Sequence, residues 1–488
     1  MAQVSPSVSF RDPSGRLLLL EDRVVRLVHR NSAHALKSFL KTRVAREFSA
    51  SGRLVKTWLV DTVAESDRLH RSTIANLPTG EMDDLRSGNL RILVEHERIS
   101  FRSFPYEWPP EMLYEAGKLM LDLADAAFDE GFLLKDATPY NILFAGSRAV
   151  FVDLLSFEPR DSRNPTWLAL NQFAQTILLP LLVNKGYGLR LDQLLTVNRD
   201  GVEPSQVAQL AGPMRKLSPS FLSLVSIPHW LNKKQTLNNR HVYQPRRLQN
   251  HEMAGFVFRQ QLKRLRRQLK KVAPRVNGTS AWLEYNGPNK FFPADYRRAK
   301  ENFVAEILNR IRPRRVLDVG CNTGYFSRLA ARMGASVVAI DQDPQVVGAV
   351  WRGAAREQLD ILPLVVNLAR PTPAFGWRNE ECPSFLDRAR LAFDTVLMLA
   401  VLHHLQVVDQ IPLPAILRLA AELTTENLII ELVLPGDPMF RHLVRGRDEL
   451  YAGVTRDSFE SAAAHWFDVV AIVPLSSNRT LYQMRKRG

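Results

Sequence analysis

Residues 315–344 read RVLDVGCNTGYFSRLAARMGASVVAIDQDP and contain the pattern that decides the fold of the C-terminal part of the chain. An apolar strand, a glycine-containing turn, a helix and a second apolar strand follow one another, and the second strand ends in Asp341. Glycine is needed where the backbone takes a positive φ or approaches a ligand closely. A carboxylate at the tip of the second strand can accept hydrogen bonds from ribose hydroxyls. The stretch therefore predicts a β-turn-α-β unit that binds a nucleoside.

The turn has the spacing D-x-G-x-x-x-G, formed by Asp318, Gly320 and Gly324. It differs from the G-x-G-x-x-G of dinucleotide binders because it lacks the third glycine, which packs helix against strand beneath a pyrophosphate. This difference favours a nucleoside ligand without a diphosphate. The segment resembles motif I of class I S-adenosylmethionine-dependent methyltransferases, and the resemblance covers about residues 280–488.

Five later segments resemble the remaining strands of that family's sheet. They are residues 362–368, 393–399, 427–433, 468–473 and 479–484. We therefore expect an α/β fold for this domain, with a Rossmann-like, mostly parallel sheet of seven strands and helices on both faces. Ligands of such sheets bind beyond the carboxyl ends of the strands, where the strand order reverses.

The resemblance implies S-adenosyl-L-methionine as the cofactor. The residues expected to bind it are Asp318, Gly320, Asn322, Gly324, Asp341 and Asn367. Asp341 would bind the ribose and Asn367 the edge of the adenine ring, while the turn would hold the methionine end. The alternative is an ordinary α/β domain whose glycines only make turns.

His403 and His404 lie just past the fourth strand, on the loop that faces the transferred methyl group in this family. Either could act as a general base, because imidazole titrates near neutral pH. The alternative is that they open a helix, with one histidine hydrogen-bonded to the backbone. The aromatic residues of segment 281–292 could cover a sulfonium by cation–π contact or pack in the core.

The N-terminal part has its own pattern. Short strands are expected at residues 8–10, 17–20, 23–28, 54–60 and 92–97, and helices at 32–48 and from 109 to about 130. Asp136 is followed by Asn141 and then by Asp153 at a strand end. In phosphoryl transfer to a hydroxyl, one Asp accepts the proton while an Asn and a second Asp hold magnesium.

This constellation resembles the catalytic loop of kinase-like, aminoglycoside phosphotransferase-like folds. It implies an α+β, two-lobed domain over residues 1–231, with Asp136 as catalytic residue, Asn141 and Asp153 as magnesium ligands, and ATP as co-substrate. The sequence departs from that family at Lys135 and after Asp153, and the first 60 residues contain only two glycines. We therefore interpret the domain as a degenerate kinase-like fold, in which the same residues could instead make structural turn and capping bonds.

The positive charge is concentrated between the two domains. The chain carries 65 basic and 50 acidic residues, and the segment 232–279 alone carries 13 and 1. Within it, residues 253–272 are predicted to form a basic amphipathic helix with a stripe of leucines. We interpret 232–279 as a linker. Its helix could lie on an anionic membrane, bind a polyanion or pack its stripe on a neighbouring domain.

The amino-acid composition limits the structural class and the cellular compartment that we expect. With 45% apolar and 24% charged residues the chain is expected to be globular rather than disordered or fibrous. No apolar run is long enough to span a bilayer, and the N-terminus does not have the pattern of a signal peptide. The two cysteines favour a reducing compartment. We expect a cytoplasmic protein, with the surface of the inner membrane as a place where it could dock.

The motifs of both halves, taken together, resemble a bacterial methyltransferase family that includes nodulation host-specificity proteins. The resulting prediction is an S-adenosylmethionine-dependent methyltransferase acting on a glycan, glycolipid or small-molecule acceptor. One alternative is a bifunctional methyltransferase–kinase, similar to enzymes that cap bacterial polysaccharide chains. Others are an RNA methyltransferase, ranked lower because no RNA-binding module is recognised, and an inactive membrane-surface scaffold. The motifs do not indicate the acceptor atom or the oligomeric state.

Overall fold

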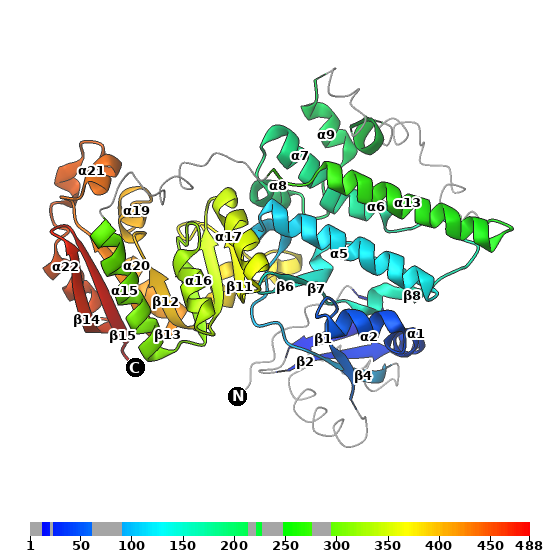
Figure 1. The fold of residues 1–488 in the computed structure, drawn as a ribbon, viewed down its shortest axis with the longest axis horizontal. Helices are drawn as coiled ribbons and strands as arrows, with labels where there is room; N and C mark the ends of the chain where they lie inside the picture. Colours follow the sequence, from blue (N-terminus) through cyan, green and yellow to red (C-terminus); the bar gives the residue numbers. More distant parts are fainter. Residues whose placement is uncertain (1–11, 20–22, 61–89, 213–220, 227–246, 276–293) are drawn as a thin grey trace.

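The computed structural model describes residues 12–19, 23–60, 90–212, 221–226, 247–275 and 294–488. The predictions for 8–10 and 281–292 lie outside these ranges. The N-terminal domain opens with a four-stranded antiparallel sheet in the order β1-β2-β4-β3 (Figure 1). Its strands are β1 (Gly15–Leu19), β2 (Val24–His29), β3 (Thr57–Leu59) and β4 (Leu90–His96).

The single helix expected at 32–48 is two helices, α1 (Arg30–Leu40) and α2 (Arg43–Ala50). The break falls at Thr42, whose backbone is extended and whose hydroxyl accepts a hydrogen bond from the Ala45 N–H at 3.1 Å. The single-helix prediction is wrong because Thr42 caps a new helix instead of continuing the old one.

The second lobe of this domain is mainly helical and surrounds α5 (Pro110–Asp129), whose apolar side chains are nearly all buried. Two short antiparallel pairs lie beside it, β5 (Phe132–Leu134) with β8 (Phe157–Pro159), and β6 (Ile142–Ala145) with β7 (Arg148–Phe151). The further helices are α6 (Leu170–Phe173), α7 (Leu179–Tyr187), α8 (Leu191–Val197), α9 (Pro204–Leu210) and α13 (His251–Lys271).

Helix α13 is the predicted basic helix, and it lies alongside α5 (Figure 1). Its leucine stripe is buried, and Phe258 stacks on Phe128 with the ring centroids 4.1 Å apart. Arg266 of α13 donates to both Asp122 and Asp125 of α5. The stripe is therefore packed on the N-terminal domain, while several lysines and arginines of α13 remain exposed.

The C-terminal domain contains the predicted seven-stranded sheet, in the order β11-β10-β9-β12-β13-β15-β14. β15 alone runs opposite to the other six strands, so the prediction of a mostly parallel sheet is confirmed. The strands are β9 (Arg315–Val319), β10 (Ser336–Asp341), β11 (Ile361–Val365), β12 (Phe393–Met398), β13 (Thr424–Val433), β14 (Phe467–Ser476) and β15 (Arg479–Lys486). The strand order reverses between β9 and β12.

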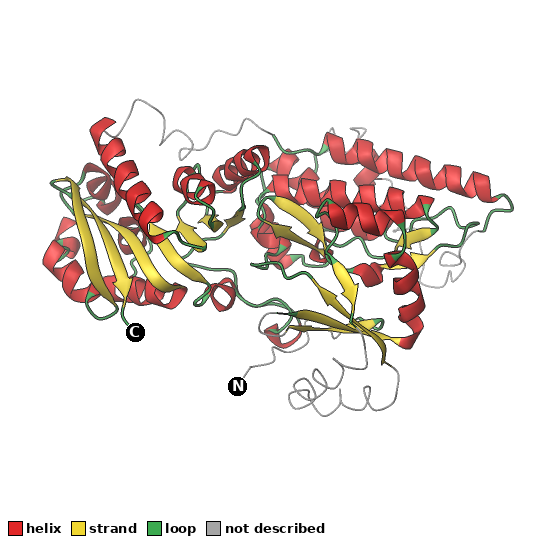
Figure 2. Ribbon diagram, turned by 60° about the horizontal axis from the view of Figure 1, so that its bottom comes forward, coloured by secondary structure: helices red, strands yellow, loops and turns green. Residues whose placement is uncertain are grey.

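Helices cover both faces of this sheet (Figure 2). Alternate residues of β9 point to opposite faces, since Val316 packs in one apolar cluster and Leu317 in another. The first cluster includes side chains of α15 (Ala294–Ile311), α16 (Tyr325–Arg332) and α17 (Pro344–Glu357). The second includes side chains of α18 (Phe385–Ala389), α20 (Leu413–Leu423) and α22 (Arg456–Ala463). Two more helices, α19 (Leu402–Val407) and α21 (Pro438–Val444), lie beyond the strand ends.

The two domains share one apolar core, because the second cluster continues into the N-terminal domain. Phe101 lies 6.0 Å from Phe385 and 5.8 Å from Phe393, measured between ring centroids. A buried ion pair joins Glu107 of the short 3-10 helix η1 (Pro105–Glu107) to Arg388 of α18. The domains are therefore packed as one body, and no helix in the described ranges is long and apolar enough to cross a membrane.

Candidate functional site

The turn between β9 and α16 has the backbone that its glycines predict. Gly320, Asn322 and Gly324 all take a positive φ, of 66°, 48° and 72°. A Cβ on Gly320 would lie 3.1 Å from the Val401 side chain, and one on Gly324 would lie 2.9 Å from Val350. The close packing explains both glycines and leaves bare backbone at the carboxyl end of β9, as a nucleoside-binding turn requires.

Asp341 closes this turn from the end of β10. Its Oδ2 accepts a hydrogen bond from the Asn322 N–H at 3.1 Å, and its Oδ1 accepts one from the Asp343 N–H at 3.0 Å. Burial raises the pKa of the Asp341 carboxyl, although these N–H groups act in the opposite direction. The carboxylate thus lies beside the turn, where it can face the hydroxyls of a ribose.

Asp318 has a different position from the other predicted cofactor residues. It is almost fully buried, and its Oδ2 accepts a hydrogen bond from the Ser327 hydroxyl at 2.5 Å. Burial raises the pKa of Asp318 from its ordinary 3.8 to about 6. In the structure Asp318 therefore ties strand β9 to helix α16 beneath the turn.

Asn367 lies next to the loop after β10. Its Nδ2 donates to Gln342 Oε1 at 3.0 Å, and its own Oδ1 accepts from the Ala369 N–H at 2.8 Å. Arg190, which precedes α8 in the N-terminal domain, donates to the Gln342 carbonyl at 2.7 Å. The N-terminal domain therefore contacts the loop that follows Asp341, a contact that the sequence did not indicate.

The two histidines lie on α19, beyond the end of β12. Val401, which packs on Gly320, brings their loop against the turn. His403 is fully buried, and neither of its ring nitrogens has a hydrogen-bond partner among the described residues. Burial and the neighbouring His404 lower the pKa of His403 well below its usual value. Burial also lowers the pKa of His404 to about 4, so both rings are neutral at pH 7.

A buried polar cluster beside the histidines was not predicted from the sequence. Glu431 Oε1 of β13 accepts from the Tyr296 hydroxyl at 2.5 Å, and its Oε2 accepts from Lys300 Nζ at 2.6 Å. Arg479 donates to Glu431 at 3.1 Å and to Asp437 at 2.7 Å. Burial would raise the pKa of Glu431, but Lys300 and Arg479 outweigh it and lower that pKa. The cluster joins α15, β13 and β15, which lie far apart in sequence, so no local pattern indicates it.

Two of the three residues predicted for a kinase-like site, Asn141 and Asp153, share a hydrogen-bond partner in Ser156. The Ser156 hydroxyl donates to Asp153 Oδ2 at 2.5 Å and accepts from Asn141 Nδ2 at 3.1 Å. Burial raises the pKa of Asp136, and the charge of Asp153 acts in the same direction. Arg26 of β2 donates to Asp153 Oδ1 at 2.5 Å. Burial alone would raise the pKa of Asp153, but the charge of Arg26 and the hydrogen bonds from Ser156 and Arg26 together outweigh it and lower that pKa.

Comparisons with known proteins agree with the C-terminal geometry. Residues 292–482 match the family model described as a methyltransferase domain. The chain is 29% identical over 497 residues to nodulation protein NoeA of Rhizobium meliloti (strain 1021), covering 98% of this chain and 95% of NoeA. It is also 34% identical over 175 residues to a tRNA U34 carboxymethyltransferase of Hahella chejuensis (strain KCTC 2396), covering 33% of this chain and 46% of that protein.

Among solved structures, the N-methyltransferase NodS from Bradyrhizobium japonicum WM9, in complex with S-adenosyl-L-homocysteine, aligns at 13% identity and a TM-score of 0.30. The alignment covers 44% of this chain and 95% of NodS. The family match over residues 292–482 identifies the C-terminal domain as a methyltransferase domain. The whole chain is a homologue of NoeA.

Proposed function

We propose that this protein transfers the methyl group of S-adenosylmethionine to a hydroxyl-bearing acceptor of the glycan, glycolipid or small-molecule class. The observation that carries the proposal is the position of Asp341, whose carboxylate lies 3.1 Å from the backbone nitrogen of Asn322 in the glycine turn. A ribose carboxylate and a bare-backbone turn at the point of strand reversal are what an adenosyl ligand needs.

Each part of the site has a role in this proposal. Asp341 binds the ribose, Asn367 lies at the adenine edge, and the 320–324 turn holds the methionine end. When bound, S-adenosylmethionine supplies an electrophilic methyl group. The low pKa of both histidines keeps them in the form that accepts a hydrogen bond. A pKa of about 4 makes His404 a weak base, so we assign it to orienting the acceptor hydroxyl, with positioning contributing most of the rate. As the bond from the methyl carbon to the hydroxyl oxygen forms, the bond from the methyl carbon to the sulfonium sulfur would break, and the hydroxyl proton would pass to solvent.

The polar cluster around Glu431 supports a hydroxylated acceptor. Tyr296, Lys300 and Arg479 already pair with Glu431 in this cluster. The ring nitrogens of His403, which have no partner among the described residues, are the polar groups to which we assign one acceptor hydroxyl. An apolar acceptor would leave those nitrogens without a partner, which costs free energy in a buried site.

The test is labelled methyl transfer by the full chain into a bacterial extract, with the product fractionated into glycan, lipid, RNA and protein. We expect label in the glycan, glycolipid or small-molecule fraction, and none from an Asp341→Ala variant. Label confined to RNA would reject the acceptor class and favour the RNA alternative. No binding of S-adenosylmethionine to the folded chain would reject the methyltransferase proposal itself.

For the N-terminal domain we propose a degenerate kinase-like fold that positions substrate rather than transferring phosphate. Asn141 and Asp153 support the kinase-like origin because both hydrogen-bond to Ser156, and Asp136 lies close enough to Asp153 for the charge of Asp153 to act on it. The ion pair with Arg26 supports the loss of activity, since a guanidinium already satisfies the carboxylate that magnesium would need. We expect no thermal shift of the wild-type chain with magnesium and ATP. A clear shift that Asp153→Asn abolishes would instead establish the bifunctional alternative.

A further inference from the structure

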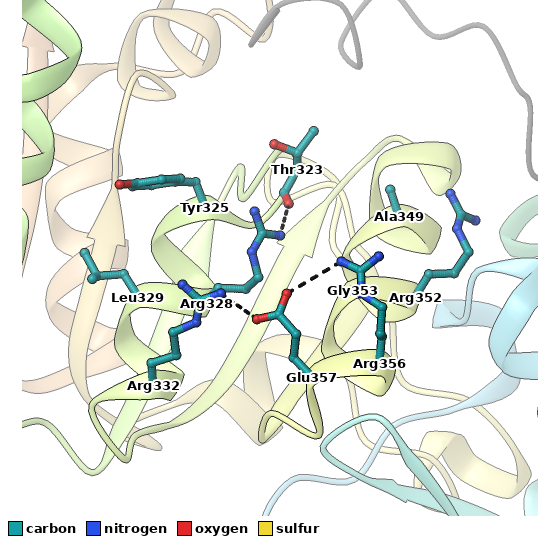
Figure 3. A pocket seen from close by; sticks show the side chains of 10 residues that line it. All are labelled: Thr323, Tyr325, Arg328, Leu329, Arg332, Ala349, Arg352, Gly353, Arg356 and Glu357. Atoms are coloured by element: carbon teal, nitrogen blue, oxygen red, sulfur yellow. Dashed lines mark hydrogen bonds and ion pairs between the residues drawn. The ribbon is translucent and has the colours of Figure 1, made fainter.

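Helices α16 and α17 line a pocket of about 540 Å³ that borders the glycine turn at Thr323 (Figure 3). The residues that line it are Thr323, Tyr325, Arg328, Leu329, Arg332, Ala349, Arg352, Gly353, Arg356 and Glu357. Four of the ten are arginines, and they come from both helices. The pocket is therefore strongly basic.

The arginines form two i,i+4 pairs, Arg328 with Arg332 on α16, and Arg352 with Arg356 on α17. Like charges at this spacing destabilise a helix by a few tenths of a kcal/mol. One carboxylate lines the pocket, that of Glu357, which pairs with Arg332 at 2.6 Å and with Arg356 at 3.7 Å. The hydrogen bond from Arg332 lowers the pKa of Glu357, so its carboxylate stays charged near pH 7.

The other two arginines have partners that do not bring a carboxylate into the pocket lining. Arg328 donates to the Thr323 carbonyl oxygen at 2.7 Å, which is an uncharged acceptor. Arg352 pairs with Glu111, which reaches in from α5 of the N-terminal domain. The pocket lining thus holds four guanidinium groups against one carboxylate.

Gly353 keeps room between these groups. A Cβ at this position would lie 3.7 Å from Arg328 Nη1, so any larger side chain would enter the space beside that guanidinium. Glycine inside a helix costs about 1 kcal/mol relative to alanine. The like charges of Arg352 and Arg356 and the interior Gly353 all weaken α17. A ligand that binds to the arginines and occupies the space beside Gly353 would explain why these residues are present.

We propose that this pocket binds the phosphate or diphosphate group of a small ligand. Guanidinium groups bind phosphate oxygens through paired, charge-assisted hydrogen bonds, and several arginines on two facing helices can hold two phosphoryl groups at once. Glu357 competes for the same arginines and sets a limit on affinity. Thr323 of the glycine turn is the point where the pocket meets the proposed cofactor site, and neither the two histidines nor Asp341 nor Asn367 lines the pocket.

Binding of inorganic pyrophosphate to the full chain, measured by calorimetry at 150 mM salt, tests this assignment. We expect the R332Q/R356Q double variant to bind pyrophosphate at least tenfold more weakly, because both arginines are exposed and their replacement need not disturb the core. Glu357→Gln should bind more tightly than wild type, because it removes the competing carboxylate.

A matched control exists on the same domain. Arg390 and Arg418 flank Glu422 at 3.5 and 3.1 Å, as Arg332 and Arg356 flank Glu357, but they do not line the pocket. The R390Q/R418Q variant has the same charge change and should bind pyrophosphate as wild type does. Equal weakening in both double variants, or no binding of pyrophosphate by wild type at this salt, would overturn the proposal. S-adenosylmethionine binding, measured in parallel, reports separately on the cofactor site.

Discussion

The carboxylate of Asp341 accepts a hydrogen bond from the backbone N–H of Asn322 at 3.1 Å, although the two residues lie on different segments of the β-turn-α-β unit. One side chain therefore both shapes the glycine turn and presents an acceptor to a ribose. This double role decides how substitutions at position 341 should be compared.

Replacing Asp341 by Ala should weaken S-adenosylmethionine binding at least tenfold, because charge-assisted hydrogen bonds contribute about 1.5–3 kcal/mol each. Asp341→Asn keeps an oxygen for the Asn322 N–H and should have a smaller effect. Calorimetry on the full chain measures both. Glu426→Gln, an exposed position at the opposite end of the sheet, serves as control and should bind as wild type. Unchanged affinity in Asp341→Ala would contradict the ribose assignment.

Asp318 should make stability depend on pH. Its pKa in the folded chain is raised from 3.8 to about 6, so the folded state holds this proton more tightly than the unfolded state. The free energy of unfolding therefore falls as pH rises from about 4 to about 6, by about 3 kcal/mol, and stays lower above that range.

Asp318→Asn removes this titration while keeping an oxygen acceptor for Ser327. In urea unfolding, we expect the variant to be close to wild type at pH 4 and more stable at pH 7. Other groups titrate alike in both chains, so the difference isolates position 318. A difference that does not change between pH 4 and pH 7 would show that the Asp318 pKa is not raised.

Arg190 should act as a positioning residue for the cofactor site. It donates to the Gln342 carbonyl, and Gln342 in turn accepts from Asn367. Arg190→Met should weaken S-adenosylmethionine binding about two- to tenfold, the range expected for one hydrogen bond. Arg264→Met on the exposed side of α13 is the charge-matched control. If both variants bind equally well, the contact has no influence on the site.

The buried pair of Glu107 and Arg388 should couple the unfolding of the two domains. The two side chains are 0% and 3% exposed. Removing one partner leaves a buried charge unpaired, so Arg388→Met should cost about 3–5 kcal/mol. We expect one calorimetric transition for wild type. Two separate transitions in wild type would contradict the shared core.

A double variant separates the pair from the packing around it. Arg388 also lies over the rings of Phe101, Phe104 and Phe385. Glu107→Gln with Arg388→Met removes both charges and should lose less stability than Arg388→Met alone. A double variant that is less stable than Arg388→Met would show that the charges are not what couples the two residues.

The C-terminal fold could be predicted from the sequence because its signals are local. Each buried parallel strand is a short apolar run, and the glycines and Asp341 follow the strands at fixed spacing. The prediction of a methyltransferase rests on these signals, and it is confirmed by the family match over residues 292–482. The cluster of Tyr296, Lys300, Glu431 and Arg479 could not be predicted, because only the folded sheet brings α15, β13 and β15 together.

Local sequence patterns also could not identify the surface on which residues 253–272 pack. The leucines of 253–272 are compatible with a membrane, a polyanion or a protein surface, and the choice depends on α5. Asp122, Asp125 and Asp129 on α5 supply three carboxylates that pair with arginines of α13. Likewise, nothing near Glu107 in sequence indicates that its counter-ion is Arg388. The break at Thr42 was missed because a threonine within a helical pattern can also be tolerated as an interior residue.

The common apolar interior has a practical outcome for anyone who wishes to divide this molecule. A cut made between residues 275 and 294 would separate rings that pack across the two domains. Phe101 packs on Phe385 and Phe393, and Tyr106 packs on Phe375. Each piece would expose apolar surface that is buried in the intact protein, and it would tend to aggregate. Assays with truncated halves would then report on precipitation more than on chemistry, so the undivided polypeptide is the material on which to study either half.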